Sequence, residues 1–493
     1  MNSALLIITL FLLLALLVAI RAKKGKKMSL EQWTVGGRGF GTLFVFLLMA
    51  GENYTTFTFL GASGYTYGKG APAFYILGYG CLAFIMSYWM LPAVWKYAKK
   101  HELLSFSDFF ASKYNSPALG IVVSFVAVLG LNSLLMIQLK GLGIIVSETS
   151  YGLISPNMAM WIGVLAMIVY VSISGIHGSA SIAAIKDVII LGIALFLGIY
   201  LPIHFYGGFE SMFQAIDAAK PGFLTLPAKE QSISWYLSTI LVVGLGYWMY
   251  PHSFQATYSA KSAKSLRKNA IIMPVYQILI VLIFFVGFAA ILQVPDLEGT
   301  DADLALLRVV KETFNPWFVG IVGGTGLLTA LVPGSMILLN ASTLVAKNVY
   351  QVVSPKATEK HVTTVAKSLV PVFALLSLYF VFQGGNFIVE LSIFASSILT
   401  QLFPAFIFSL MKKPFVTKQG AFAGIIAGAT FLAYFTITKT KLVILFPDWP
   451  SLITDINIGF IAMLLNAFVL VLVSVITRRE AEIQVQRVTS YKD

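Results

Sequence analysis

The stretch FVFLLMAGENYTTFTFLGASG, from Phe44 to Gly64, is long and apolar enough to cross a bilayer, yet Gly51, Glu52 and Asn53 lie near its centre. On insertion scales a carboxylate at the middle of a membrane helix costs about 2.5–3.5 kcal/mol. Glycine weakens a helix by roughly 1 kcal/mol relative to alanine in water. The pattern predicts a local unwinding that frees backbone carbonyls and helix ends to bind an ion and a polar solute. The alternative is that Glu52 faces the bundle as a neutral acid or pairs with a distant lysine.

The rest of the chain has the composition of a membrane protein that crosses the bilayer many times. Of its 493 residues, 58% are hydrophobic and 11% are charged, and the mean hydropathy is +0.84. That is too little charge to cover the surface of a soluble domain of this length. The one cysteine, Cys81, excludes a disulfide within the chain and argues against a cysteine metal site.

Apolar runs recur along the whole length and predict an all-α protein with about thirteen membrane-spanning helices. The first run precedes the basic cluster Arg21–Lys27, which indicates a retained span instead of a cleaved signal peptide. The predicted spans are residues 4–21, 42–67, 72–95, 117–147, 158–175, 182–205, 233–257, 270–293, 316–347, 363–383, 387–411, 419–438 and 456–477.

The formal net charge of +13 would suggest a nucleic-acid partner in a soluble protein. Here the lysines and arginines cluster in short loops that fall on one side if the spans alternate, and the acidic loop Val294–Asp303 falls on the other. Basic loops face the cytoplasm. We therefore expect a multi-pass protein of the cell membrane, with its N-terminus outside, its C-terminus in the cytoplasm and no nucleic-acid partner.

A second predicted span is interrupted, in VVGLGYWMYPHSF (Val242–Phe254), where Gly244, Gly246 and Pro251 weaken the helix. This span lies five spans after the first interrupted one. Paired broken helices at matching positions of two halves are typical of inverted-repeat transporters and of their midplane binding sites. The spacing therefore predicts a five-plus-five arrangement.

Several short motifs occur in order along the chain, and together they resemble the sodium:solute symporter family, which includes the proline permease and bacterial sugar symporters. They cover nearly the whole chain, although each is weak alone. The motifs are VGGRGFG (Val35–Gly41), SFSDFFASKYNS (Ser105–Ser116), AIKDVII (Ala184–Ile190), GYWMYPHSFQ (Gly246–Gln255) and NASTLVAKNVY (Asn340–Tyr350).

The resemblance implies the leucine-transporter fold, in which ten core spans form two inverted repeats and one bundle rocks around a central site. We accordingly treat residues 1–493 as one transmembrane transporter domain. Its parts are an extra first span with a basic loop (1–30), the inverted-repeat core (40–411), two extra spans (412–480) and a cytoplasmic tail (481–493).

The resemblance also implies a sodium site between the second and ninth spans. Gly51 and Tyr54 match the positions whose carbonyls hold sodium in the family. The matching ninth-span positions are Thr329, Val332 and Pro333, so two hydroxyl ligands of the family are missing. Pro333 has no N–H, which leaves the carbonyl of Thr329 free to act with its hydroxyl as a replacement ligand.

A proton is the alternative coupling ion, and Glu52 is then the candidate carrier, because the pKa of a buried carboxyl can rise toward neutrality. By resemblance, Asp187 lies on the intracellular exit path of the ion and joins the predicted ion-binding residues. A local ion pair with the neighbouring Lys186 is the other interpretation of Asp187.

Polar and aromatic residues near the two breaks are the candidates for binding the solute. Lys140 could supply a cation for a carboxylate, or it could snorkel to an interface or pair with Glu52. Tyr247 and Trp248 could gate the site. The predicted substrate-binding residues are Asn53, Thr55, Thr56, Gln138, Lys140, Gly246, Tyr247, Trp248 and Gln401.

These features favour a cation-coupled secondary active symporter that imports a small polar organic solute. A monocarboxylate is the first candidate, because the Glu52–Asn53 pair and the TALVP run (Thr329–Pro333) look like the monocarboxylate permease branch of the family. An amino acid such as proline, or pantothenate, is the alternative, and a channel suits the isolated polar residues less well. We expect no enzymatic activity and no cofactor besides the coupling ion. The expected partners are the small organic solute and the lipid bilayer, with no obligate protein partner.

Overall fold

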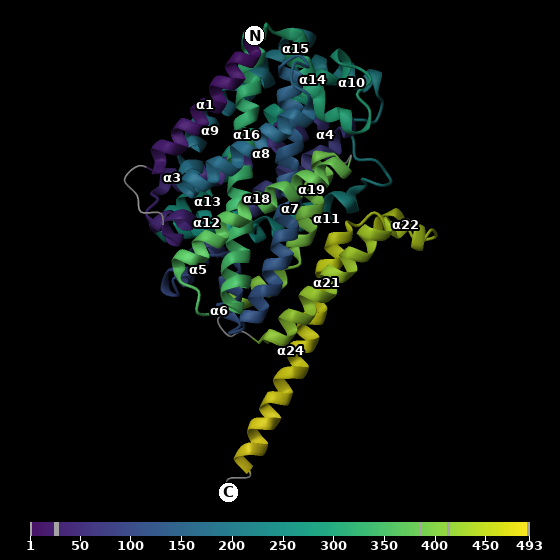
Figure 1. The fold of residues 1–493 in the computed structure, drawn as a ribbon. Coiled ribbons are helices and arrows are strands. Elements are labelled where there is room, and N and C mark those ends of the chain that lie inside the picture. Colours follow the sequence, from purple (N-terminus) through teal and green to yellow (C-terminus); the bar gives the residue numbers. More distant parts are fainter. Residues whose placement is uncertain (1, 24–28, 385–386, 412–414, 491–493) are drawn as a thin grey trace.

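The computed structural model describes residues 2–23, 29–384, 387–411 and 415–490, which form one bundle of long helices (Figure 1). The helix α1 begins at one end of this bundle, and α24 leaves it at the opposite end. The helices that form the spans, some of them as halves of a bent span, are α1 (Ser3–Lys23), α3 (Thr42–Asn53), α4 (Ala62–Lys69), α5 (Tyr75–Lys100), α7 (Pro117–Thr149), α8 (Pro156–Ser174), α9 (Ile176–Tyr206), α11 (Ile233–Gly246), α12 (Pro251–Ser259), α13 (Ala263–Ile278), α14 (Ile280–Gln293), α16 (Pro316–Val345), α18 (Glu359–Gln383), α19 (Ile388–Thr400), α20 (Phe403–Ser409), α21 (Lys418–Thr438) and α24 (Ile458–Ser490).

Further helices and turns connect these spans. They are α2 (Leu30–Val35), α6 (Phe106–Lys113), α10 (Phe209–Ala219), α15 (Ala305–Thr313), α17 (Gln351–Val353), α22 (Leu442–Leu445) and α23 (Ser451–Thr454), with tight or wide turns η1 (Gly36–Arg38), η2 (Phe57–Gly61), η3 (Ala71–Phe74), η4 (Tyr247–Met249), η5 (Gly299–Leu304) and η6 (Ala346–Tyr350).

The number of spans agrees with the hydropathy pattern. Ten of the described helical stretches could each cross a membrane alone, and three bent pairs raise the count to thirteen. The predicted boundaries hold to within a few residues at most ends. The largest differences are at α13, which begins at Ala263 instead of residue 270, and at α24, which continues to Ser490 instead of ending at residue 477.

The three bent pairs place the helix breaks. The pair α3 and α4 is bent by 49°, and the pair α11 and α12 by 50°, as the two interrupted spans predicted. The third pair, α19 and α20, is bent by 44°, and the prediction of only two interrupted spans was wrong on this point. Pro404 explains the third break, because its ring cannot donate a hydrogen bond to the carbonyl of Thr400, where α19 ends.

Two of the sequence motifs meet at the end of the bundle that carries α6. Ser105 and Asp108 form a capping box at the start of α6, where Asp108 accepts hydrogen bonds from the backbone N–H groups of Leu104 and Ser105, both at 2.9 Å. The same carboxylate pairs with Lys347 and accepts a bond from Asn348 at 2.7 Å. Burial alone would raise the pKa of Asp108, but the Lys347 ammonium and these hydrogen bonds hold it below its usual value. Lys347 and Asn348, which follow the ninth span, thereby connect that span to α6.

Candidate functional site

The first helix break gives the site its backbone. The helix α3 ends at Asn53, and Tyr54 leaves the helical conformation with φ −90° and ψ 80°. The hydroxyl of Thr58 donates to the carbonyl of Asn53 at 2.5 Å, and the Tyr54 hydroxyl donates to the carbonyl of Tyr276 at 2.9 Å. The break is thus held in place by side-chain hydrogen bonds that replace part of the helical ladder.

The two carbonyls expected to hold sodium accept hydrogen bonds from a lysine. The ammonium of Lys186, on α9, donates to the carbonyl oxygen of Gly51 at 2.8 Å and to that of Tyr54 at 2.7 Å. It also lies 3.0 Å from Oδ1 of Asp187, and the Lys186 side chain is 0% exposed. Asp187, predicted on an ion exit path, is therefore an ion-pair partner of this lysine. Sequence reasoning missed the contact of Lys186 with the break, although a lysine inside an apolar span was its signal.

Close packing brings Gly51 to α9. A Cβ atom built at Gly51 would lie 3.2 Å from Cβ of Ala183 and 3.6 Å from Nζ of Lys186. A side chain at position 51 would therefore push α3 away from α9 and lengthen the bonds to the ammonium. The glycine that marked the break in the sequence serves this close approach.

The ninth-span candidates lie in the buried helix α16, which continues through Pro333. The Thr329 hydroxyl donates to the carbonyl of Gly326 at 2.6 Å, which commits its hydrogen within its own helix. Val332 contributes an apolar side chain to the core, and Pro333 lines the cavity described next. The role of the Thr329 carbonyl as an ion ligand stays a prediction.

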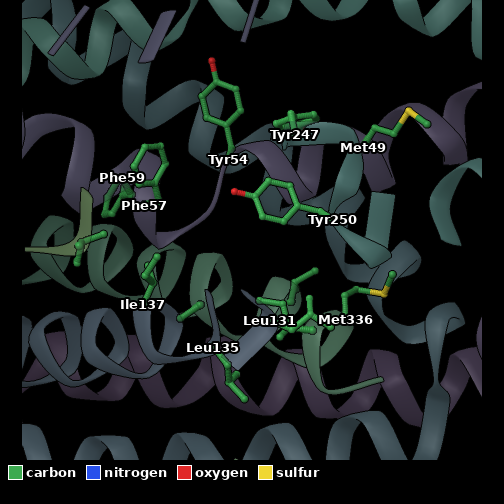
Figure 2. Close-up of a cluster of buried hydrophobic side chains, with 14 of the residues drawn as sticks. Met49, Tyr54, Phe57, Phe59, Leu131, Leu135, Ile137, Tyr247, Tyr250 and Met336 are labelled. Atoms are coloured by element: carbon green, nitrogen blue, oxygen red, sulfur yellow. The ribbon is translucent and has the colours of Figure 1, made fainter. Parts of the chain in front are cut away.

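A cavity of about 60 Å³ lies between the two predicted breaks. Figure 2 shows Tyr247 and Tyr250 near the unwound segment at Tyr54, with aliphatic side chains such as Leu135 below them. The lining residues come from the broken spans and from α5, α7, α16 and α19, and include Glu52, Asn53, Thr55, Phe57, Tyr79, Gln138, Tyr247, Tyr250, His252, Pro333 and Ser392.

Several polar atoms of this lining are buried and available to a ligand. Within the described residues, Oε1 of Glu52, Oε1 of Gln138 and Nδ1 of His252 have no hydrogen-bond partner. Other groups are already paired: Nδ2 of Asn53 donates to Gln277 at 2.5 Å, and the hydroxyls of Tyr250 and Ser396 are 2.6 Å apart. Buried polar atoms are costly to leave unpaired, so a polar solute would be stabilised here.

The structure places Lys140 away from the cavity lining. Its ammonium lies 3.2 Å from Oδ2 of Asp303, in the turn η5, and the same oxygen accepts a bond from the backbone N–H of Ile388 at 3.3 Å. In the structure Lys140 is paired with Asp303, and its predicted role in binding the solute stays a prediction. Burial raises the pKa of Asp303 to about 6, although the ammonium opposes the change.

Four further predicted substrate residues also lie in packing contacts. Trp248 donates its indole N–H to the carbonyl of Ala83 at 2.7 Å, and Gln401 donates to the carbonyl of Ser397 at 3.0 Å. A Cβ at Gly246 would lie 2.0 Å from Oγ1 of Thr400, and Cγ2 of Thr56 is pressed against Gly141. These four residues are not part of the cavity lining, and their role in binding the solute stays a prediction. By contrast, sequence reasoning missed Tyr79, Tyr250, His252 and Ser392.

Comparisons with known proteins agree with this architecture. The family model described as "Sodium:solute symporter family" matches residues 33–428. The chain is 62% identical to "Uncharacterized symporter YhjB" of Bacillus subtilis (strain 168), over 97% of this chain and 98% of that protein. It is 26% identical to the "Monocarboxylate transport permease protein" of Rhizobium johnstonii, over 95% of both chains.

Among solved structures, a Na+-coupled sialic acid symporter in a substrate-bound, outward-open state matches with a TM-score of 0.76 at 16% identity, over 97% of this chain and 98% of that one. The amino-acid-bound transporter MhsT matches with a TM-score of 0.55 at 15% identity, over 87% of this chain and 98% of that one. These likenesses show the leucine-transporter fold. Family membership supports a cation-coupled symporter with sodium as the coupling ion. The chain belongs to the sodium:solute symporter family, and it is a multi-pass membrane transport protein and not an enzyme.

Proposed function

We propose that this protein imports a small polar organic solute together with a cation, and that the solute binds in the cavity between the two broken spans. The observation that carries the proposal is the group of unpaired buried polar atoms on Glu52, Gln138 and His252, three residues that line the cavity at the helix breaks. In inverted-repeat transporters such breaks form the substrate site. The protein would lie in the cell membrane with its N-terminus outside, because the basic loops then face the cytoplasm.

The size of the cavity favours a short-chain monocarboxylate. A cavity needs roughly 10–15 Å³ to hold one water, so the cavity of about 60 Å³ is small. Acetate, pyruvate and lactate are small solutes, and pantothenate is far larger. The similarity to a monocarboxylate transport permease supports the same class.

A carboxylate solute and Glu52 would have to share a proton. Two negative charges about 4 Å apart repel by about 4 kcal/mol at an effective dielectric constant of about 20. A proton on Glu52 removes this repulsion and supplies a donor, so binding of the anion and of the proton would be linked. This linkage makes Glu52 the candidate proton carrier.

The unpaired Glu52 oxygen also favours a second class of solute, a small amino acid, whose ammonium could pair with the ionised carboxylate. The two classes predict opposite responses to protonation. A monocarboxylate binds better when Glu52 is protonated, and an amino acid binds better when it is ionised.

Uptake in proteoliposomes tests the proposal. Labelled acetate, lactate, pyruvate, proline and pantothenate would be offered with a sodium gradient and a proton gradient imposed separately. We expect uphill accumulation of one of the small solutes under at least one gradient, and none of pantothenate. Downhill flux with unitary currents would instead indicate a channel, and no accumulation of any solute would reject the proposal.

A further inference from the structure

We infer that the ammonium of Lys186 is a built-in cation that fills the carbonyl site of Gly51 and Tyr54, so that sodium does not enter this site in the wild-type protein. The carbonyls are the ones that the family resemblance assigned to sodium. The inference deepens the proposed function, because it concerns the ion site of the same transporter. Its consequence for transport rests on that function, but its test needs no solute.

The geometry of the ammonium matches that of a bound cation. Lys186 reaches from α9 to the broken span and donates at 2.8 Å and 2.7 Å to two carbonyls that belong to one break. Asp187 contributes a carboxylate at 3.0 Å, so two carbonyls and one anion surround the charge. A lysine ammonium has three N–H donors and is a compact point charge, as a monovalent metal ion is.

A sodium ion and this ammonium exclude each other. Carbonyl oxygens bind hard cations at about 2.3–2.6 Å. An ion shared by Gly51 and Tyr54 would therefore lie within a few ångströms of Nζ of Lys186. Two like charges so close in a buried site repel strongly, and the negative charge of Asp187 is already balanced by the lysine.

The ninth span does not compensate for this repulsion with its side chains. The Thr329 hydroxyl is bonded to Gly326, and the next two positions expected to supply hydroxyl ligands are Val332 and Pro333. The absence of hydroxyl ligands at positions 332 and 333 and the presence of the Lys186 ammonium are two independent observations. Both point to a tethered cation in place of a free one.

The test is the thermal stability of the purified full-length protein in NaCl, KCl or choline chloride at equal ionic strength. The wild-type Tm is expected to be the same in all three salts. In Lys186→Met the apolar stem is kept and the ammonium is removed, which leaves Asp187 and the two carbonyls unoccupied. Its Tm is expected to be lower than that of the wild type and to rise by several degrees in NaCl only, because sodium binding stabilises the folded state.

Lys140→Met is the matched control, since it removes a lysine that pairs with an aspartate elsewhere in the bundle. Its Tm is expected to show no sodium-specific rise. A sodium-specific rise in the wild type would overturn the inference, and so would an unresponsive but folded Lys186→Met. If that variant does not fold, Lys186→Gln replaces it, and the wild-type measurement decides in either case.

The outcome is distinguishable from a failure of the proposed function. A wild-type protein that is stabilised by sodium but accumulates a monocarboxylate rejects the inference and leaves symport intact. If the Tm of the wild type is the same in all salts and no solute accumulates, the result supports the site filled by Lys186 and rejects the proposed transport activity.

Discussion

Lys186 and Lys140 both lie within the helix bundle and both contact an aspartate, but their surroundings differ. Lys186 pairs with its neighbour in the same helix and uses its remaining donors on backbone carbonyls, with 0% of its side chain exposed. Lys140 pairs with Asp303, 163 residues away, and 18% of its side chain is exposed. A lysine paired locally is free to hold a broken helix, whereas a lysine paired across elements joins those elements together.

The difference suggests two separate roles for buried positive charge in one transporter. The pair of Lys186 and Asp187 lies at the helix break, where Lys186 contacts the carbonyls of Gly51 and Tyr54. The pair of Lys140 and Asp303 connects α7 to the turn η5 and, through the N–H of Ile388, to the start of α19. The turn η5 directly precedes α15, which lies at the end of the bundle where the chain begins (Figure 1). Each of the following variants changes one of the two regions.

The largest effect is expected from removing the ammonium at the break. Lys186→Met leaves the Asp187 carboxylate buried without its partner, and breaking such a pair costs about 3–5 kcal/mol. The measurement is the free energy of unfolding without sodium, from chemical denaturation. The double variant with Asp187→Asn also removes the stranded charge, so it is expected to recover most of the loss. A single variant as stable as the wild type would show that the pair is not essential to the break.

The pair at the other end is expected to respond to pH. The pKa of Asp303 is raised by burial to about 6 in the folded protein, against about 3.9 in an unfolded chain. An acid whose pKa is raised by folding stabilises the folded state at pH values below the pKa of the unfolded chain. This stabilisation is lost as the pH rises through the folded pKa of about 6. Relative to Asp303→Asn, the wild type should therefore lose about 2 kcal/mol between pH 4 and pH 7.

Melting curves of both proteins across this pH range give the measurement, and their difference isolates Asp303 from the other titrating groups. Lys140→Met sharpens the result, because without the ammonium the carboxyl is harder to ionise. In Lys140→Met the loss of folding stability with rising pH should therefore occur at a higher pH than in the wild type. Parallel curves for wild type and Asp303→Asn would contradict the raised pKa.

The third effect concerns coupling instead of stability. Glu52→Gln keeps the shape of the side chain but cannot release a proton, so accumulation driven by a proton gradient should fall by at least about tenfold while exchange of solute continues. Labelled uptake and counterflow in the same vesicles give the two quantities. Glu390→Gln is the matched control, since Glu390 is exposed at the start of α19. Unchanged accumulation in Glu52→Gln would remove it as the proton carrier.

These two regions also show how far the sequence could predict the molecule. Glycine and proline revealed the breaks at Gly51 and Gly246, since their effect on a helix is local. The break after Thr400 was missed although Pro404 marks it. The contact of Lys186 with α3 depends on how two distant helices cross, which hydrophobic periodicity does not specify.

The lining of the cavity was predictable only in part, for a related reason. Tyr247 lines the cavity, whereas its neighbour Trp248 points away and bonds to Ala83. Which of two adjacent aromatic residues faces inward depends on the phase of the tight turn η4, and composition gives no information on that phase. Tyr79 and Tyr250 read as ordinary core residues for the same reason, because aromatic side chains are common in buried helices.

The smallest effect is expected at Thr329, and it depends on the state of the break. The Thr329 hydroxyl is already bonded to Gly326, and the ammonium of Lys186 occupies the carbonyls that would share an ion with it. Thr329→Val should therefore leave the Tm of the otherwise wild-type protein equal in NaCl and KCl. In the Lys186→Met background the same change should reduce the sodium-specific rise, since the vacated site then draws on every nearby oxygen. A sodium response that Thr329→Val weakens in the wild-type background would instead show that a free ion binds beside the lysine, and the two charged regions would no longer differ in the way proposed.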